Sequence, residues 1–139
     1  APNVPDIKEI ARAVAEVGAD AISAINTMPG MVIDIETGKP VLHNKEGGVS
    51  GPAIKPVAVK CIYDIYESAD VPIIGIGGVT YGKDAIELMM AGASAVQIGT
   101  GIYYRGIEIF RLVSQEIEEF LSGHGYSNLK DIVGIAHEN

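Results

Sequence analysis

Two short glycine-rich segments are the part of this sequence best suited to hold an anion. Residues 75–78 read Gly-Ile-Gly-Gly and residues 99–101 read Gly-Thr-Gly, and each segment follows a short apolar run. Glycine lets the backbone approach a ligand closely, and a row of free N–H groups can hold a phosphate. The two segments together favour a phosphate site, and a pair of tight turns is the alternative interpretation.

Two further segments offer polar groups. Asn26 and Thr27 follow another apolar run and carry an amide and a hydroxyl, which suit a planar ligand with several carbonyl and N–H groups. An asparagine that bonds its own backbone is equally compatible with the pattern. Residues 47–52, Gly-Gly-Val-Ser-Gly-Pro, lead into a helix start, where free amides favour anions. A flexible lead-in with Ser50 as a cap is the alternative there.

Other side chains that could catalyse or bind metal are scarce. The single cysteine, Cys61, lies on the apolar stripe of an expected helix, where a thiol packs as a small hydrophobe. The histidines His43, His124 and His137 lack the spacing of metal ligands. Glu116, near Glu118 and Glu119, is expected on a solvated helix face.

Composition narrows the class of protein. The 139 residues carry a formal net charge of −8, which argues against binding to a nucleic acid or to an anionic membrane surface. One cysteine excludes an intramolecular disulfide framework. No apolar run approaches the roughly 18 residues of a membrane span, and the first residues show no leader pattern. A soluble, cytoplasmic chain is expected.

Apolar spacing predicts helices that alternate with short buried strands. Helices are expected over about residues 6–17, from residues 51–52 onward, and over about 82–91 and 107–121, with strands over 21–25, 71–76 and 95–98. Pro2 and Asn3 would end one further strand. The residues expected to face inward on the first and last of these helices are Ile7, Ile10, Ala11, Val14, Val17, Phe110, Val113, Ile117 and Phe120. This is the α/β pattern of parallel βα units, whose sites lie at the C-terminal ends of the strands.

One segment breaks this alternation. Residues 26–50 are far longer than an ordinary connection between a strand and a helix. Apolar runs on either side of Glu36-Thr37-Gly38-Lys39 predict a β-hairpin insertion over about residues 28–48, which projects from the end of the first complete strand.

Four motifs in register resemble the dihydroorotate dehydrogenase family, best in its class 1, NAD-linked type. They are Ile-Asn-Thr at 25–27, Gly-Gly-Val-Ser-Gly-Pro-Ala-Ile-Lys-Pro at 47–56, Ile-Gly-Ile-Gly-Gly-Val at 74–79 and Gln-Ile-Gly-Thr at 97–100. The barrel of dihydropyrimidine dehydrogenase is a weaker match. The resemblance implies that residues 1–139 are the C-terminal half of one FMN-binding (β/α)8 TIM barrel, from the tip of the fifth strand to the end of the eighth.

The resemblance also implies a reaction and a set of roles. The reaction is the flavin-dependent oxidation of dihydroorotate to orotate in de novo pyrimidine (UMP) biosynthesis. By position, Gly77, Gly78, Gly99 and Thr100 would hold the FMN phosphate. Ile25 and Gly51 would contact the flavin or its ribityl chain, with Ser50 as a neighbour, and Asn26 and Thr27 would bind the pyrimidine ring. The catalytic base, a cysteine, and a flavin-contacting lysine are expected upstream of Ala1, so the isolated chain would be inactive.

The implied assembly is a cytoplasmic homodimer that forms a heterotetramer with an electron-transfer subunit carrying FAD and a [2Fe–2S] cluster. The open inner surface and two free sheet edges predict self-association or contact with the rest of the barrel. Two alternatives stay open at this point. One is a phosphate-binding barrel that acts as an isomerase or aldolase, although no strand-end lysine supports a Schiff base. The other is a catalytically inactive half-barrel that only binds FMN.

Overall fold

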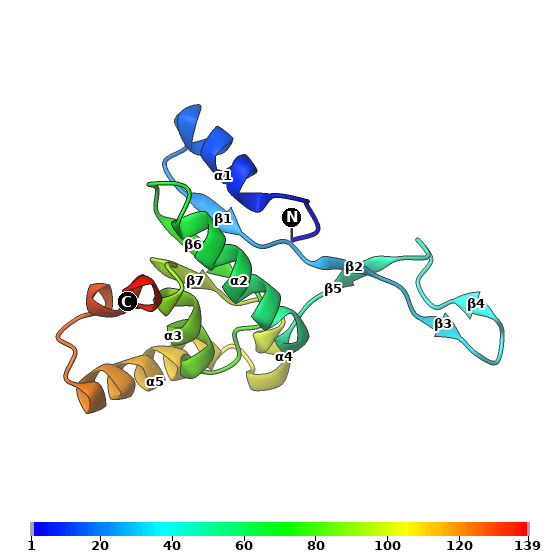
Figure 1. The fold of residues 1–139 in the computed structure, drawn as a ribbon. Helices are drawn as coiled ribbons and strands as arrows, with labels where there is room; N and C mark the ends of the chain where they lie inside the picture. The colour runs from blue at the N-terminus through cyan, green and yellow to red at the C-terminus, as the bar shows by residue number, and fades with distance from the viewer. Residues whose placement is uncertain (1, 139) are drawn as a thin grey trace.

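The computed structural model describes residues 2–138, and helices alternate with strands along most of the chain (Figure 1). The helices are α1 (Ile7–Glu16), α2 (Lys55–Tyr66), α3 (Gly82–Met90), α4 (Gly101–Arg105) and α5 (Ile109–His124). The strands are β1 (Ile22–Ala24), β2 (Met28–Gly30), β3 (Ile33–Asp34), β4 (Lys39–Pro40), β5 (Gly47–Val49), β6 (Ile73–Ile76) and β7 (Ala95–Gln97). Short 3-10 turns cover Pro52–Ile54, Leu129–Ile132 and Ile135–His137.

A three-stranded parallel sheet forms the centre of the molecule. Its strand order is β1-β6-β7, with Ala24 beside Gly75 and Gly75 beside Val96. Because the strands are parallel and in this register, their C-terminal ends lie together on the same side of the molecule (Figure 1). The C-terminal ends of the strands are where α/β folds place their sites.

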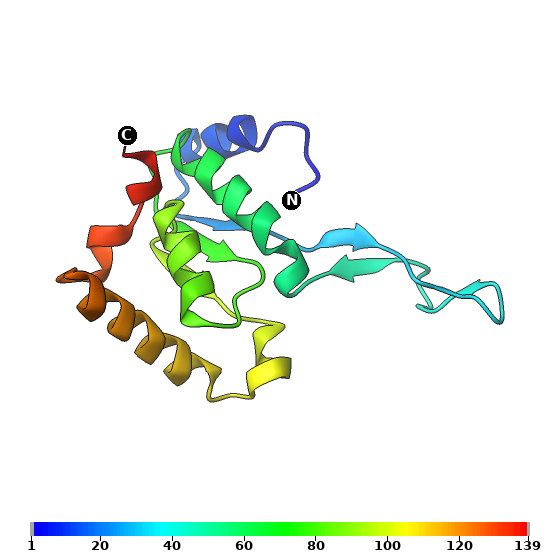
Figure 2. The same cartoon turned by 60° about the horizontal axis from the view of Figure 1, so that its bottom comes forward.

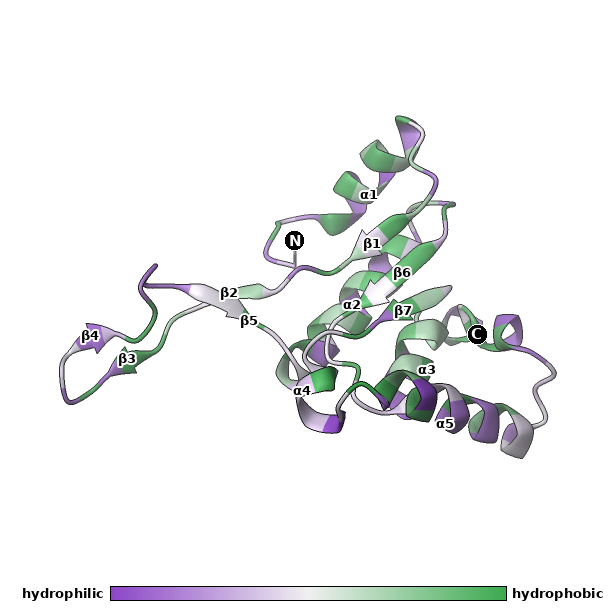
Figure 3. Ribbon diagram, turned by 180° about the vertical axis from the view of Figure 1, so that it is seen from behind, coloured by the Kyte–Doolittle hydropathy of each residue, from purple (hydrophilic) through white to green (hydrophobic). Residues whose placement is uncertain are grey.

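The helices cover only one face of this sheet. Ile62 and Ile65 of α2 and Leu88 of α3 are almost fully buried and belong to the same apolar cluster as Ile73 of β6. On the other face Ser23 and Ala95 are exposed, and Ile74 between them is only partly buried. Figure 3, seen from behind, accordingly shows the three strands in front of α2 and α3.

The predicted α/β alternation is confirmed, with differences at three places. The short helix α4 was not predicted, and α5 begins at Ile109 and runs to His124. Residues 2–5 form a turn and a bend, so the strand end expected at Pro2 and Asn3 is wrong within the described residues. Pro2 and Pro5 have no N–H group to donate to a strand ladder.

Several residues expected to face inward lie at the surface. Ile10, Val17 and Phe110 are 46%, 86% and 47% exposed, whereas Ala11 and Val113 are buried as expected. Val14 is also exposed. An amphipathic helix shows that one face is apolar but not which element covers it. Among residues 2–138, no element covers those parts of α1 and α5.

Residues 28–49 form an antiparallel arm that extends from the body of the protein (Figures 1 and 2). At its base β2 pairs with β5, with Met28 beside Val49 and Gly30 beside Gly47. Farther out, β3 pairs with β4. Most of its apolar side chains are exposed, among them Ile35 near the tip.

Candidate functional site

The C-terminal ends of β1, β6 and β7 surround a cavity of about 290 Å³. Its lining comes from those three ends, from the segment before α2 and from the start of α4. The lining residues are Ile25, Thr27, Ser50, Gly51, Ile54, Ile76, Gly77, Gly78, Val79, Gln97, Gly99, Thr100 and Gly101. The structure therefore brings the two glycine-rich segments of the sequence to one cavity.

The loop after β6 requires glycine at two successive positions. Gly77 and Gly78 have φ angles of +135° and +79°, a region that other residues rarely adopt. A Cβ atom on Gly77 would lie 2.8 Å from Ala58 Cβ, and one on Gly78 would lie 2.6 Å from Lys55 Cβ. The loop is thus pressed against the start of α2, and its backbone rather than its side chains borders the cavity.

Backbone N–H groups at this cavity lack partners. Within residues 2–138, the N–H groups of Gly77, Gly78, Val79, Gly99 and Thr100 donate no hydrogen bond to another group. Gly77 and Val79 are buried residues, whose N–H groups are normally paired, and a row of free N–H groups forms a binding place for an anion. The donor set therefore fits a phosphate group, which can accept several such hydrogen bonds at once.

Thr100 and Ser50 meet across the mouth of the cavity. Thr100 Oγ1 donates a hydrogen bond to Ser50 Oγ at 2.8 Å. Gly51 follows with a φ angle of +84°, and a Cβ atom there would lie 3.1 Å from Thr100 Cγ2. The turn before α2 begins at Gly51 without a side-chain cap, so Ser50 bonds across the site and is not a helix cap.

Asn26 and Thr27 lie at the exposed end of β1, beside a second cavity. Asn26 Oδ1 accepts a hydrogen bond from the Thr27 N–H at 2.8 Å, which is the local bond considered as an alternative from the sequence. Both residues line a space of about 460 Å³ together with Asn3, Asn44 and Glu46. Thr27 borders both cavities, so a ligand in one would lie next to a ligand in the other.

Asn3, Asn44 and Glu46 were not predicted from the sequence, although they line the second cavity. Asn44 and Glu46 lie on the returning limb of the arm, and the pairing of β2 with β5 brings that limb beside Thr27. No local motif marks these residues, because their position depends on the register of the arm.

A network of ion pairs lies behind the loop after β6. Buried Asp84 accepts hydrogen bonds from the N–H groups of Thr80 and Tyr81 and from Lys55 Nζ. Arg105 donates to Glu116, and Glu116 also accepts from the Gly82 N–H. Glu118 and Glu119 are exposed as expected, whereas the Glu116 side chain is 31% exposed and is paired with Arg105 rather than left to solvent alone. The Arg105 hydrogen bond is the main cause that lowers the pKa of Glu116.

Asp84 should make the free energy of unfolding depend on pH in the acid range. Its burial alone would raise the pKa, but the hydrogen bonds from Lys55, Tyr81 and Thr80 outweigh burial and lower it below the ordinary 3.8. A lowered native pKa means that the unfolded chain binds more protons, so stability is lost as the pH falls through the native pKa. In urea unfolding between about pH 7 and about pH 3, Asp84→Asn should lose less stability on the acid side than the wild type. Equal acid slopes would contradict this assignment.

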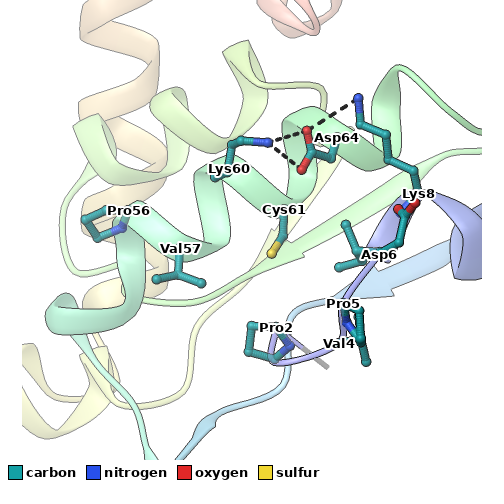
Figure 4. Close-up of a pocket in the computed structure, with 11 residues that line it drawn as sticks. Pro2, Val4, Pro5, Asp6, Lys8, Pro56, Val57, Lys60, Cys61 and Asp64 are labelled. Atoms are coloured by element: carbon teal, nitrogen blue, oxygen red, sulfur yellow. Dashed lines mark hydrogen bonds and ion pairs between the residues drawn. The ribbon is translucent and has the colours of Figure 1, made fainter.

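A larger cavity, of about 650 Å³, lies away from the strand ends between residues 2–8 and α2 (Figure 4). Cys61 borders it but is buried, and burial raises the pKa of its thiol, which suits the packing role expected from the sequence. The charges there pair with one another: Lys60 Nζ lies 2.5 Å and Lys8 Nζ 3.7 Å from Asp64 Oδ1. The Asp64 carboxylate at this cavity is therefore neutralised by two lysines.

Two classes of site receive no support from the described residues. Across residues 2–138, no group of three or more histidine, cysteine or acidic side chains is placed to hold a metal ion. In the same part of the chain, no helix combines the length and the apolar character that crossing a membrane requires.

Comparisons with known proteins agree with one another. The family model described as dihydroorotate dehydrogenase matches residues 1–121. The proteins named dihydroorotate dehydrogenase B (NAD(+)), catalytic subunit, of Methanocaldococcus jannaschii and Methanosarcina acetivorans are 58% and 55% identical over 137 residues. Those alignments cover 99% of this chain and 44% of each relative, so the chain spans less than half the length of these curated relatives.

Solved structures give the same result. The crystal structure of the Eimeria tenella enzyme DHODH in complex with ferulenol superposes with a TM-score of 0.84 and 33% identity, covering 100% of this chain and 37% of that one. The ligand-free form gives a TM-score of 0.83 at the same identity, covering 39% of its chain.

Proposed function

Because this chain belongs to the dihydroorotate dehydrogenase family, we propose that it supplies the flavin phosphate site and part of the substrate site of an enzyme that oxidises dihydroorotate to orotate in pyrimidine biosynthesis. The observation that carries this proposal is the set of unpaired N–H groups at the neighbouring ends of β6 and β7. Neighbouring strand ends of this kind form the phosphate site of many (β/α)8 barrels.

The fold we propose for the complete enzyme is a (β/α)8 TIM barrel, with residues 1–139 as its C-terminal part. Three parallel strands with helices on one face and edges at β1 and β7 are what part of such a barrel would look like. A whole barrel needs about 250 residues, which agrees with the greater length of the relatives. The arm would be the hairpin insertion, over about residues 28–48.

The cofactor we propose is FMN. Gly77, Gly78, Gly99 and Thr100 would hold its phosphate through backbone N–H groups, and Ile25 and Gly51 would contact the flavin or its ribityl chain. When bound, FMN would supply the hydride acceptor of the reaction. The protein residues would fix its position and keep the adjacent cavity free for the substrate.

The substrate would bind in the cavity beside Asn26 and Thr27. The Asn26 amide nitrogen donates no hydrogen bond within residues 2–138, and Thr27 lines both cavities. Orotate and dihydroorotate carry carbonyl and carboxylate oxygens that can accept from such donors. These two residues would therefore hold the pyrimidine ring next to the flavin.

Asn26→Ala should weaken substrate binding but not flavin binding. Loss of a hydrogen bond to a charged ligand costs about 1.5–3 kcal/mol, which corresponds to roughly a 10–100-fold rise in the KM for dihydroorotate. The flavin content should stay unchanged, because Asn26 lines only the second cavity. Thr37→Ala, at the exposed tip of the arm, is the control and should leave the KM unchanged. An unaltered KM in Asn26→Ala would argue against this substrate site.

The proposed enzyme is the catalytic subunit of a cytoplasmic, NAD-linked assembly, with a homodimer at its centre and a partner subunit that carries FAD and a [2Fe–2S] cluster.

Identifying the bound flavin tests the proposed function. The flavin released from the purified catalytic subunit should be FMN, at one molecule per chain. Release of FAD, or the absence of flavin, would count against it. The 139-residue chain alone should not reduce a dye with dihydroorotate, because the base is expected outside it.

A further inference from the structure

The loop after β6 has two parts, which differ in whether their backbone N–H groups are bonded to the protein. The N–H groups of Gly77, Gly78 and Val79 are unpaired within the described residues. The next three N–H groups, those of residues 80–82, all donate to carboxylates. The loop therefore passes directly from a stretch available to a ligand to a stretch held by the protein.

Asp84 holds this second stretch from α3. Its Oδ2 accepts from the N–H groups of Thr80 at 3.0 Å and Tyr81 at 2.8 Å, and its Oδ1 accepts from Lys55 Nζ at 2.9 Å. Lys55 is the first residue of α2. A side chain on Gly78 would collide with the Cβ atom of Lys55. Asp84 thus connects the loop to the helix against which the loop packs.

Arg105 holds the same stretch from α4. Its Nη1 donates to the Thr80 carbonyl oxygen at 3.0 Å, and its Nη2 donates to Glu116 Oε1 at 2.7 Å. Its guanidinium carbon also lies 4.6 Å from the centre of the Tyr81 ring. Because α4 follows Gly99 and Thr100 directly, Arg105 connects the two glycine-rich segments behind the cavity.

Capping of α3 explains only part of this network. A carboxylate at the helix start would account for the Tyr81 N–H bond. It does not account for a second bond to the Thr80 N–H, for the Lys55 ion pair or for an arginine on the Thr80 carbonyl. Buried Thr80 is held through both of its backbone polar groups, which fixes the orientation of the peptide that follows Val79.

A fixed loop matters for binding because ordering a flexible one would reduce affinity. A carboxylate near a phosphate site would repel the ligand unless its charge were neutralised. Lys55 provides that neutralisation, since its ammonium group pairs with both Asp84 and Glu87. The network can therefore order the loop without presenting an unpaired negative charge to the cavity.

We propose that Asp84 and Arg105 are positioning residues for a phosphate bound at Gly77, Gly78 and Val79, and that they set the preference of the site for FMN over riboflavin. This inference rests on the function proposed above. Neither side chain contacts the ligand. Each acts through Thr80, which orients the free N–H groups toward the phosphate.

The test is to titrate FMN and riboflavin separately into the flavin-stripped enzyme and to follow flavin fluorescence. The wild type should bind FMN more tightly than riboflavin. Asp84→Asn keeps the side-chain shape but loses an acceptor oxygen, so FMN affinity should fall about 10-fold or more while riboflavin affinity changes by less than about threefold. Arg105→Gln should act in the same direction. Glu87→Gln is the matched control and should change neither affinity, because Glu87 contacts only Lys55 of this network.

Three results would overturn the proposal. If Asp84→Asn and Arg105→Gln keep the wild-type ratio of FMN to riboflavin affinity, the positioning role is wrong and the FMN site stands. If both variants lose the two flavins equally, their role is only structural. If the wild type itself has no preference for FMN, the proposed function fails and the positioning role with it. Circular dichroism reports folding, and Arg105→Gln decides the question if Asp84→Asn does not fold.

Discussion

Replacing Gly78 with alanine should lower the FMN affinity of the enzyme by about 100-fold or more. A Cβ atom at this position would lie 2.6 Å from Lys55 Cβ, 3.0 Å from Lys55 Cα and 3.1 Å from the Gly51 carbonyl oxygen. Two of these three atoms are backbone, so the loop itself must move. The N–H groups of residues 77–79 then lose their common direction, and the loss of one or two charge-assisted hydrogen bonds accounts for a change of this size.

Gly125→Ala is the matched control for this experiment. Gly125 has a φ angle of +76°, close to the +79° of Gly78, but nothing lies within 4 Å of an added Cβ atom. It ends α5, far along the chain from the cavity lining. This variant should carry the same backbone strain and keep FMN affinity. If Gly78→Ala bound FMN within about threefold of the wild type, the loop would not be the phosphate site.

Ile62→Ala should be strongly destabilising. Ile62 is 0% exposed, and its Cδ1 lies where a side chain on Gly75 of β6 would be. Removing such a side chain leaves a cavity and costs about 2–5 kcal/mol of unfolding free energy. The packing of α2 on β6 positions both the loop after β6 and the segment before α2, so flavin binding should also weaken.

Urea unfolding measures this effect, and Ile35→Ala is its control. Ile35 is 89% exposed near the tip of the arm, so its truncation should change the unfolding free energy by less than about 0.5 kcal/mol. Similar small losses in both variants would show that α2 is not packed on the sheet as described.

The sequence predicted the elements that position the site because their signals are local. Cys61 was expected on the apolar stripe of a helix, and it is buried in α2 as expected. The glycines at 77 and 78 were singled out as positions for close backbone approach, and their positive φ angles require glycine. Their roles toward FMN remain proposals, which the variants above test.

What the sequence could not predict depends on contacts between distant elements. Helix α4 has too few turns for a periodic pattern, so the position of Arg105 behind Thr80 was not foreseen. Glu116 resembles its solvated neighbours in the sequence, and only the approach of α5 to Gly82 and Arg105 distinguishes it. Phe110 and Ile10 were predicted to face inward but are exposed. Their apolar spacing marks one face of a helix and does not show whether another element covers that face.

The most direct test of the central proposal is to add dihydroorotate without oxygen to the purified enzyme that contains this chain, and to record its visible flavin absorbance. The protein should carry FMN, and dihydroorotate should bleach the FMN absorbance in proportion to the amount added. A flavin that dihydroorotate leaves unbleached, or a protein with no flavin that does not take up added FMN, would contradict the account.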